Sequence, residues 1–418
     1  IPTHWECVPL RSIFKFRNEK NDPIKTDNIL SLSIANGVTE YSDENRGGNK
    51  RKDDLSSYKL AYPNDIVLNS MNVIVGAVGV SKYFGAISPV YYALSLYNQR
   101  ANLSYYESIF KNENFQRGLL RFGKGILIKF GENGKMNTIR MKISQDDFKK
   151  LYFPIPPLSE QQKIAQFLDD KTAKIDQAVD LAKKQIALLK EHKQILIQNA
   201  VTRGLNPDVP LKDSGVEWIG QVPEHWELTI GMNVFRENKR DNKGMKENTV
   251  LSLSYGKIII KPEEKLFGLV PESFETYQIV EPNDIIIRCT DLQNDQTSLR
   301  TGLAQDKGII TSAYLNLKVI NNYSAKFLHY YLHALDITKV LYKFGSGLRQ
   351  NLSFLDFKRL PIIDISLAEQ QQIADYLDKQ TSKIDQAIAL KTAHIEKLKE
   401  YKSVLINDVV TGKVRVSV

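Results

Sequence analysis

The sequence LSEQQKIAQFLDDKTAKIDQA at residues 158–178 returns as LAEQQQIADYLDKQTSKIDQA at residues 367–387. The two copies match at 14 of 21 positions, and a constant offset of 209 relates them without an insertion. Each copy opens a stretch that contains no Gly or Pro, over residues 158–203 and 367–411. These stretches predict two equivalent long helices, and therefore a chain with an internal two-fold repeat.

The repeat extends beyond the helices, and the order of the repeated segments is the same in both halves. These segments are Pro2–Glu6 and Pro223–Glu227, Leu30–Ser33 and Leu251–Ser254, and Pro63–Ile66 and Pro282–Ile285, at offsets of 221, 221 and 219. The segment Asp213–Gly220 precedes the second His-Trp-Glu motif and has no counterpart in the first half, so we expect a short natural N-terminal segment ahead of Ile1.

The repeat predicts four parts: a globular domain at 1–157, a central helix at 158–206, a second globular domain at 207–365 and a C-terminal helix at 366–418. Short apolar runs between turn residues predict β-strands in both globular domains, and one helical stretch follows in each. The predicted strands are 65–68, 73–80 and 93–96 in the first domain and 248–253, 257–260, 284–287 and 314–319 in the second. The predicted helices are 105–120 and 325–342. The fold class is α+β.

The two long helices carry apolar residues at heptad spacing. One such series is Leu168, Ile175, Ala182, Leu189 and Leu196, and the offset of 209 gives it a partner series from Leu377 to Leu405. This pattern is typical of a coiled coil, and an antiparallel pairing would place one globular domain at each end. The alternative is a pair of ordinary core helices in one larger domain. Lys193 and Lys402 occupy equivalent heptad positions, where a structural role or a phosphate contact is possible.

Charge and cysteine content restrict the class of protein. The chain has a net charge of +9, and residues 1–157 carry 22 basic and 15 acidic side chains, whereas residues 207–365 carry 19 and 20. A basic chain is compatible with nucleic acid, but the second globular domain could bind it only through a local patch. The two cysteines cannot form a disulfide framework, which favours a reducing cytosol, and no apolar run is long enough to span a bilayer.

No catalytic motif is complete. The run from Gly118 to Gly125 resembles a phosphate-binding loop, but Gly125 stands where a Mg²⁺-binding Ser or Thr is needed. His329 and His333 are one helical turn apart and lack a third metal ligand, so core or surface histidines are the expected interpretation. Neither Asp65 nor Asp284 is followed by the acidic-x-Lys strand of a nuclease, and the Asn/Asp-Pro-Pro-Tyr motif of adenine methyltransferases is absent. The sequence therefore indicates a binding protein.

Polar loops of the first globular domain are candidate DNA contacts. A basic loop could follow the phosphate backbone, although neighbouring Asp and Glu residues also fit a solvated surface loop. Polar residues after the strand at 65–68 could read base edges, and a third group precedes the long helix, where we expect phosphate contact. The candidates are Arg46, Asn49, Lys50, Arg51 and Lys52; Asn69, Ser70 and Asn72; and Lys124, Lys135 and Arg140.

The second globular domain has different residues at the matching places. Arg can pair with guanine and Asn or Gln with adenine, so divergence inside a retained framework fits two different sequence readers, although a structural loop would also diverge. The candidates are Arg288, Thr290, Asp291, Gln293, Asn294, Gln296 and Arg300, followed by Lys343, Ser346, Arg349, Gln350 and Asn351.

Together these features resemble the specificity subunit of Type I restriction–modification systems, across essentially the whole chain. The motifs that carry the resemblance are Pro-Pro-Leu158-Ser-Glu160-Gln161-Gln162-x-Ile164, its copy Leu367-Ala-Glu369-Gln370-Gln371-x-Ile373, and Asp213-Ser-Gly-Val-Glu-Trp218-Ile-Gly220 ahead of Pro223-Glu-His225-Trp226-Glu227. One departure is Ser366, which replaces the second Pro found at Pro157 and leaves the architecture unaffected.

The resemblance implies two target-recognition domains separated by two antiparallel helices that act as a ruler, in a chain without catalytic activity. It implies double-stranded DNA as a ligand, with an asymmetric site in two parts. The implied protein partners are two copies of an adenine-N6 methyltransferase subunit, together with the motor-nuclease subunits. S-adenosylmethionine, ATP and Mg²⁺ are expected in those partners and no cofactor in this chain. A non-DNA-binding coiled-coil adaptor, or an enzyme in its own right, remains the alternative.

Overall fold

The structure is a computed structural model of the chain. It describes residues 1–42, 54–71, 77–124, 128–130, 136–139, 142–262, 273–290, 292, 295, 298–344 and 351–416. The chain divides into two compact units. The first unit comprises residues 1–182 and 393–418, and the second comprises residues 183–392. Each unit therefore contains a globular part and one segment from each long helix.

The first unit combines short antiparallel strands with helices. Its sheet of four strands has the order β2-β9-β6-β7, and four further strand pairs surround it in the described residues. The elements are β1 (Glu6–Pro9), η1 (Leu10–Ser12), β2 (Phe14–Arg17), β3 (Leu30–Ser33), β4 (Gly37–Glu40), β5 (Lys59–Ala61), β6 (Asp65–Asn69), β7 (Val78–Val80), β8 (Gly85–Ile87), β9 (Tyr91–Leu96), α1 (Leu103–Lys111), α2 (Glu113–Gly118), η4 (Leu119–Phe122), β10 (Ile128–Phe130), β11 (Met136–Ile139), α3 (Gln145–Lys149) and β12 (Tyr152–Ile155), followed by α4 (Leu158–Arg203).

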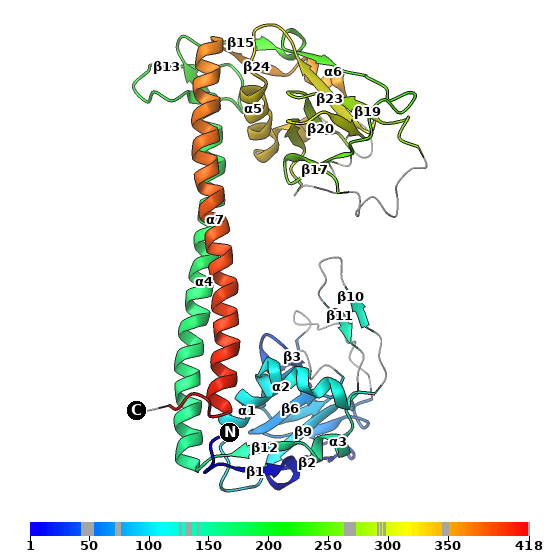
Figure 1. Ribbon diagram of the computed structural model, residues 1–418, viewed down its shortest axis with the longest axis vertical. Helices are drawn as coiled ribbons and strands as arrows, with labels where there is room; N and C mark the ends of the chain where they lie inside the picture. The colour runs from blue at the N-terminus through cyan, green and yellow to red at the C-terminus, as the bar shows by residue number, and fades with distance from the viewer. Residues whose placement is uncertain are drawn as a thin grey trace. The chain divides into compact units, whose positions relative to one another are not determined.

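The second unit repeats this arrangement. Its sheet has the order β16-β23-β20-β21, in which each strand corresponds to a strand of the first sheet. The central strands β20 and β23 of this sheet, and β6 and β9 of the first, are labelled in Figure 1. The elements are β13 (Leu211–Asp213), β14 (Gln221–Pro223), β15 (Glu227–Ile230), η5 (Gly231–Asn233), β16 (Phe235–Glu237), β17 (Leu251–Ser254), β18 (Lys257–Ile260), β19 (Gln278–Val280), β20 (Ile285–Arg288), β21 (Thr301–Leu303), β22 (Gly308–Ile310), β23 (Tyr314–Val319), α5 (Ala325–Ile337), η7 (Val340–Lys343), α6 (Phe354–Lys358) and β24 (Pro361–Asp364), followed by α7 (Leu367–Val410).

The predicted mixture of helix and sheet is confirmed, but both predicted shorter helices are interrupted. Helix α1 ends before Asn112, whose side chain accepts the backbone N–H of Phe115 and so starts α2. Helix α5 ends at Ile337, and Lys339 with φ of +63° separates it from η7. Asn favours N-cap positions over helix interiors, and a left-handed residue breaks the helical hydrogen bonds. The strand predicted at 248–253 begins only at Leu251.

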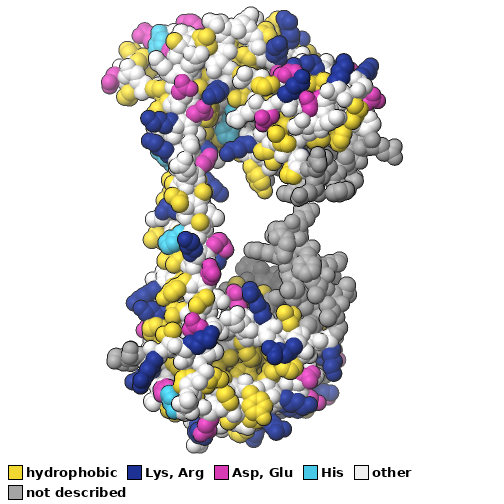
Figure 2. Space-filling view, in the orientation of Figure 1, with side chains coloured by type: hydrophobic (Ala, Val, Ile, Leu, Met, Phe, Trp, Pro, Cys, Tyr) yellow, Lys and Arg dark blue, Asp and Glu magenta, His cyan; other side chains and the backbone are white. Residues whose placement is uncertain are grey.

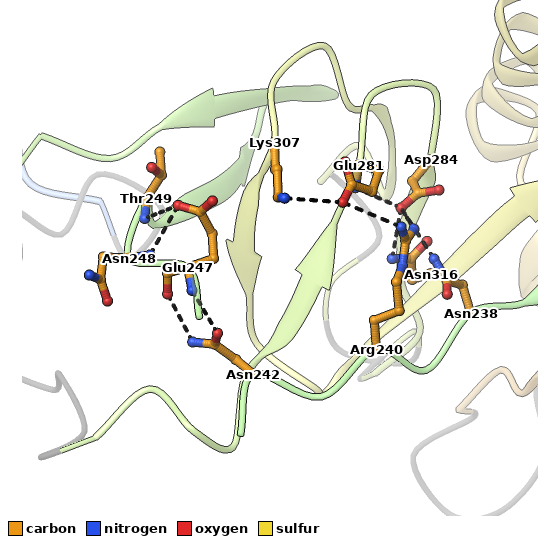
Figure 3. Close-up of polar contacts among 10 residues, drawn as sticks. All are labelled: Asn238, Arg240, Asn242, Glu247, Asn248, Thr249, Glu281, Asp284, Lys307 and Asn316. Atoms are coloured by element: carbon orange, nitrogen blue, oxygen red, sulfur yellow. Dashed lines mark hydrogen bonds and ion pairs between the residues drawn. The ribbon is translucent and has the colours of Figure 1, made fainter. Parts of the chain in front are cut away.

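A buried aspartate fixes the same turn in both units. Asp65 and Asp284 are 2% and 3% exposed, and each accepts the backbone N–H of the residue three positions earlier, at 2.9 Å. The turn places Asn64 and Asn283 at φ of +70° and +71°, a conformation that Asn tolerates better than most residues. An arginine neutralises each carboxylate, but from different positions in the two units. Figure 3 shows Arg240 beside Asp284, and in the first unit Arg17 donates to Asp65.

The two long helices pair within each unit, and residue numbers rise along one segment as they fall along the other. In the first unit, Leu168 packs in the same cluster as Val409, and Asp176 accepts from Lys402 at 2.6 Å. In the second unit, Lys193 donates to Asp385 at 2.7 Å. Because 209 residues separate both Asp176 from Asp385 and Lys193 from Lys402, the same ion pair forms twice. These contacts support the structural role for the two lysines.

Candidate nucleic-acid interface

The His-Trp motif of each unit binds the first turn of a long helix. Trp5 Nε1 donates to Glu160 at 2.8 Å, and His4 Nε2 lies 2.9 Å from the same carboxylate. The second unit repeats these contacts: Trp226 Nε1 lies 3.0 Å and His225 Nε2 3.2 Å from Glu369.

These contacts also tune the charge at the helix start. Burial alone would raise the pKa of the Glu160 carboxyl, but the hydrogen bonds from Trp5 and His4 outweigh it, so the net pKa is lowered. A carboxylate in the first turn also interacts favourably with the helix dipole.

The adjacent glutamine joins each helix to the globular part behind it. Gln161 is fully buried, donates to the carbonyl of Pro156 at 2.7 Å and accepts the backbone N–H of Asn102 at 2.8 Å. Gln370 donates to the carbonyl of Ile365 and accepts the N–H of Ser324, both at 2.8 Å. The repeated Glu-Gln pair therefore fixes the angle at which each globular part meets its helix, which is a structural task that the resemblance alone did not reveal.

In the first unit, two segments that are distant in sequence converge at the end of β6. The backbone N–H of Ile143 donates to the carbonyl of Ser70 at 3.1 Å, and Lys142 and Lys124 exchange backbone hydrogen bonds of 3.1 and 3.2 Å. Asn69 is half-buried, whereas Lys124 and Lys142 are exposed. The structure thus brings the polar end of β6 together with Lys124, which the sequence analysis selected as a phosphate contact. Ser70 itself is fully buried, and its hydroxyl donates to the carbonyl of Val90.

The second unit makes the same convergence with different side chains. The backbone N–H of Leu352 donates to the carbonyl of Cys289 at 2.9 Å, which repeats the Ile143–Ser70 bond at the matching positions. Exposed Asn351 and half-buried Thr290 lie at this junction. Arg288 is also half-buried and forms an ion pair with Asp295 at 3.0 Å. At this junction the first unit therefore has lysines, whereas the second has the Asn351 amide, the Thr290 hydroxyl and the ion-paired guanidinium of Arg288.

The predicted base contact of Arg300 is wrong for the described structure. Arg300 is fully buried and donates to the carbonyls of Arg288, Thr290 and Asp295 and to the Tyr342 hydroxyl. A guanidinium has five N–H groups and is suited to holding several carbonyls at once. Arg300 therefore organises the loop that carries the other candidates instead of reaching a base itself. Buried Ser70 is likewise unavailable to a base edge.

The electrostatics of the two junctions differ. Lys59, which the sequence analysis did not select, donates to the carbonyl of Tyr91 at 3.0 Å, and burial lowers its pKa, as does the nearby charge of Lys142. Lys59, Lys124 and Lys142 together make the junction of the first unit cationic. On the visible face of each unit, Lys and Arg side chains otherwise alternate with Asp and Glu (Figure 2). Phosphate contacts would therefore depend on local loops and not on one broad basic patch.

Many predicted contacts lie outside the described residues, and they stay predictions. They are Arg46, Asn49, Lys50, Arg51, Lys52, Asn72, Lys135, Arg140, Asp291, Gln293, Asn294, Gln296, Ser346, Arg349 and Gln350. Lys343 is described and exposed, at the end of η7. Sequence reasoning missed Lys59 and Lys142, because only the folded chain brings them to the end of β6. For Lys142 the one available signal was its place next to Ile143, an apolar position that the repeat returns as Leu352.

His329 and His333 lie on α5 with ring centroids 6.1 Å apart, and burial lowers their pKa values to about 4 and about 3. Over the described ranges, no group of three His, Cys, Asp or Glu residues could hold a metal ion. Likewise, no helix in those ranges has the length and apolar character needed to cross a membrane.

The fold defines a chain of two α+β units joined through paired long helices, and comparison with solved structures finds that arrangement elsewhere. A chain from a structure of complex assembly and conformational transition in the type I R-M system superposes with a TM-score of 0.69, at 12% identity and 98% coverage of both chains. The HsdS subunit from Thermoanaerobacter tengcongensis superposes with a TM-score of 0.55, at 13% identity, and covers 99% of this chain and 98% of its own length.

Sequence comparisons find the same class of protein. Residues 2–191 match the model of the Type I restriction modification DNA specificity domain. The protein assigned as the type I restriction enzyme MjaX specificity subunit of Methanocaldococcus jannaschii is 24% identical over 100% of this chain and 95% of its own length. The MjaVIII specificity subunit of the same organism is 23% identical over 100% and 94%. Residues 2–191 therefore match this family of domains, and the whole chain is similar to the specificity subunits of Type I restriction–modification systems, as its repeated motifs predicted.

Proposed function

We propose that this chain is the DNA-recognition subunit of a Type I restriction–modification complex, and that each unit reads one half of a two-part, asymmetric site. The observation that carries the proposal is the repeated junction. The same backbone bond joins Ile143 to Ser70 and Leu352 to Cys289, while the exposed side chains around it differ between the units. One framework with two sets of polar groups suits two sequence readers, because base contacts depend on side chains and not on the frame.

The long helices would set the distance between the two readers as an antiparallel coiled coil, with residues 1–157 and 207–365 as the two target-recognition domains. The twin ion pairs Lys193–Asp385 and Asp176–Lys402 support this pairing. Readers that enter the major groove from one side would be centred roughly 10–11 bp apart, which is one helical turn of DNA.

The proposal includes the partners that the resemblance implies. The chain itself would carry out no chemistry, and it would position two adenine-N6 methyltransferase subunits and the motor-nuclease subunits on double-stranded DNA in the cytoplasm. S-adenosylmethionine, ATP and Mg²⁺ would be bound by those subunits. Purified chain incubated with DNA, S-adenosylmethionine and Mg²⁺ should give no methylated or cleaved product, whereas the assembled complex should methylate adenine.

The decisive experiment is an exchange of one reader. Replacing residues 1–157 by the matching part of a relative, in a host that also expresses the methyltransferase, should change one half of the methylated site and leave the other half and the spacing unchanged. Methylation profiling of genomic DNA gives both halves at once. A change in both halves would contradict two independent readers.

A second experiment tests the spacer. Seven residues inserted after Ala182 and a further seven after Lys391 keep the heptads in register and lengthen both helices by about 10 Å, or roughly 3 bp at 3.4 Å per step. The double insertion should retain both half-sites and require a longer gap. Methylation of sites with the original gap would show that the helices do not set the spacing. A three-residue double insertion is the control, because it rotates the seam and should prevent assembly.

The adaptor alternative makes a different prediction for DNA binding. Phosphate contacts release counterions, so binding of a DNA reader weakens steeply as salt rises, and an adaptor would show no binding even at low salt. A filter-binding titration of mixed duplex DNA at several salt concentrations separates the two.

A further inference from the structure

Each unit has a β-hairpin whose tip exposes a large hydrophobic side chain at the matching position. In the second unit, residues 255–256 join β17 to β18, and Tyr255 is 92% exposed. In the first unit, residues 34–36 join β3 to β4, and Ile34 is 62% exposed. The offset of 221 that relates β3 to β17 also relates Ile34 to Tyr255. A large side chain that is not packed in the core therefore occurs twice at the same place.

The backbone at the tip of the second hairpin is unfavourable for a tyrosine. Tyr255 and Gly256 have φ of +48° and +76°, and Ser254 pairs with Lys257, so the two residues form a type I′ turn. This turn favours Asn followed by Gly, because both central residues are left-handed and a bulky side chain is strained there. Within the described residues, no hydrogen bond or ring contact holds the Tyr255 side chain. The stability of the hairpin does not explain this tyrosine, which points to a contact outside the chain.

The tip of the second hairpin lies beside the end of the central strand. A Cβ added to Gly256 would lie 3.1 Å from Leu299 Cδ1 and 3.7 Å from the carbonyl oxygen of Thr301, at the start of β21. The next residue toward β20 is also fixed, because the backbone N–H of Arg288 donates to the carbonyl of Arg300 at 2.8 Å. The exposed tyrosine and the polar residues that follow β20 therefore lie at one edge of the sheet.

The first hairpin is seated on its sheet in the same way. Gly79 of β7 pairs with β6 at the register at which Gly302 of β21 pairs with β20. A Cβ on Gly79 would lie 2.9 Å from the Cα of Gly37, and a Cβ on Gly302 would lie 2.7 Å from Leu253 Cδ1. Such distances leave room for glycine alone, so each hairpin packs directly on the strand beside the central one. The repeat thus keeps the position of the tip and changes its side chain.

The charge of the second hairpin fits duplex DNA as the partner. Residues 248–262 contain Lys257 and Lys261 and no acidic residue. Lys257 is exposed, and Ile259, which follows it on the same face of β18, is 44% exposed. DNA offers base faces on which an aromatic ring can stack and phosphates that attract a lysine, and the two lie close together along the strand. A tyrosine next to an unpaired cation matches that surface.

We propose that the hairpin tips contact DNA beside the two half-sites, with Tyr255 stacked on a base at a partly opened base step and Lys257 on a neighbouring phosphate. Ile34 would be the smaller wedge at the first half-site, since apolar side chains that enter a base step partly unstack it. Pyrimidine–purine steps open most easily, so each tip would favour such a step without a hydrogen bond to a base edge. This inference rests on the proposed function and adds to it residues that the sequence analysis did not select.

The test measures the stability and the DNA binding of one variant, because the two should change in opposite directions. Tyr255→Asn supplies the residue that a type I′ turn favours, so the melting temperature of the second unit should rise by on the order of 3 °C. The complex of this variant with the methyltransferase subunit should bind a duplex that carries the methylated site about tenfold more weakly, as expected for one lost stacking contact. Tyr255→Phe retains the ring, and its complex should bind within about twofold of the unchanged one.

A fluorescent base locates the opened step. 2-Aminopurine becomes brighter when it is unstacked, and it would be placed in turn at each position of the second half-site and its flanks. One step should brighten with the unchanged chain and with Tyr255→Phe, and it should stay dark with Tyr255→Asn. Ile34→Asn is the matched variant of the first unit, and it should leave the signal at the second half-site unchanged.

The outcomes separate this inference from the proposed function. Equal affinities and equal fluorescence for the unchanged and Tyr255→Asn complexes would overturn the inference alone, whereas an unchanged complex without any specific site would overturn the proposed function as well. A fall in both stability and affinity would assign Tyr255 to the fold and overturn the inference. Loss of the methyltransferase subunit from the Tyr255→Asn complex, with the DNA affinity of the chain alone unchanged, would overturn it in favour of a protein contact.

Discussion

The two units share several buried polar contacts and differ in the exposed residues at their sheet ends. Asn21 and Asn242 are both fully buried and close the same loop, with Nδ2 donating to carbonyls of Thr26 and Glu247 at 2.8 and 2.9 Å. At the end of the central strand, by contrast, the first unit has Lys124 and Lys142, and the second has the Arg288–Asp295 ion pair. These framework contacts are therefore preserved in both units, whereas the residues at the surface that is proposed to bind DNA differ.

The difference has a physical reason. A buried donor or acceptor that loses its partner leaves an unsatisfied group, which costs about 1–3 kcal/mol, so the side chains of the framework cannot change one at a time. An exposed lysine or amide can be replaced with an effect usually within about 0.5 kcal/mol. Two copies of one framework can thus come to recognise different DNA sequences without losing the fold. Substitutions of framework residues should therefore lower stability, whereas substitutions of exposed residues should not.

The largest loss of stability is expected on substitution of the tryptophan that binds the first turn of each long helix. Trp226 is fully buried and Trp5 is 8% exposed, and replacement of a buried aromatic residue by Ala costs about 3–5 kcal/mol. We therefore expect Trp226→Ala to destabilise the second unit by about 4 kcal/mol and Trp5→Ala to destabilise the first unit by a similar or smaller amount. Urea unfolding followed by fluorescence and by hydrogen exchange would assign each loss to its unit.

Trp226→Phe is the control, because it retains most of the apolar contact and removes only the hydrogen bond to Glu369. It should lose far less stability than Trp226→Ala. Equal losses in both units from a single substitution would contradict the idea that each anchor serves its own unit.

The sequence predicts the framework well for a definable reason. The long helices α4 and α7 begin and end within a residue of the stretches 158–203 and 367–411, because a Pro-marked start and a long stretch without Gly or Pro are local signals. The break at Asn112 was missed, since the preference of Asn for an N-cap is weak evidence inside an otherwise helical pattern. The side-chain contacts of the helix-entry motif were also beyond prediction, because Trp5 and Glu160 are 155 residues apart.

The candidate site was predicted less well than the fold. The positions that follow β6 and β20 were found from the repeat, but the sequence cannot tell an arginine that points outward from one that is buried. Arg300 shows this, because its partners are backbone carbonyls of Arg288, Thr290 and Asp295, and any residue could supply those. The cationic junction of Lys59 and Lys142 depends on tertiary contacts alone.

The next largest loss of stability is expected on substitution of Arg300. This substitution tests whether Arg300 supports the loop or contacts a base. Arg300→Met keeps much of the volume but leaves buried carbonyls without donors, so we expect a loss of about 3 kcal/mol in the second unit. Recognition of the second half-site should be lost, and recognition of the first half-site should remain. Stability from urea unfolding and methylation profiling measure the two consequences.

The matched variant is Arg288→Met at the neighbouring, partly exposed position. Its ion pair with Asp295 is partly screened by solvent, so the expected loss of stability is below about 1 kcal/mol. If Arg300→Met left stability unchanged while altering the recognised bases, the guanidinium would be a direct reader after all.

A smaller effect per residue, confined to the second unit, should follow from acid. Burial lowers the pKa of His329 to about 4 and that of His333 to about 3, from 6.5. As the pH falls, the two histidines are protonated in the unfolded chain before they are protonated in the folded one. The second unit is therefore at its full stability above about pH 6.5 and loses stability as the pH falls toward 4. We expect a loss of about 2 kcal/mol for each of the two histidines by pH 5, because one pKa unit is worth about 1.4 kcal/mol per group.

The first unit lacks these histidines and provides the internal comparison. At the offset of 222, its positions hold Glu107 and Lys111, which form an ion pair of 2.6 Å. Urea unfolding at several pH values should show the second unit losing stability before the first, and His329→Gln combined with His333→Leu should remove that difference. Acid sensitivity that survives the double substitution would assign it to other groups.

The smallest effect should appear at the ion pair that the repeat forms twice. Lys193–Asp385 and Lys402–Asp176 are partly exposed, with lysine side chains 26% and 31% accessible, and such pairs contribute about 0.2–1 kcal/mol. A double-mutant cycle with Lys193→Ala and Asp385→Ala should give a coupling energy of about 0.5 kcal/mol, and the cycle at Lys402 and Asp176 should agree with it. The charge swap Lys193→Asp with Asp385→Lys should restore most of the stability, because it preserves the attraction across the helix pair. If Lys193 instead contacted a phosphate, its removal would lower the salt dependence of DNA binding by about one unit in slope and leave the coupling near zero.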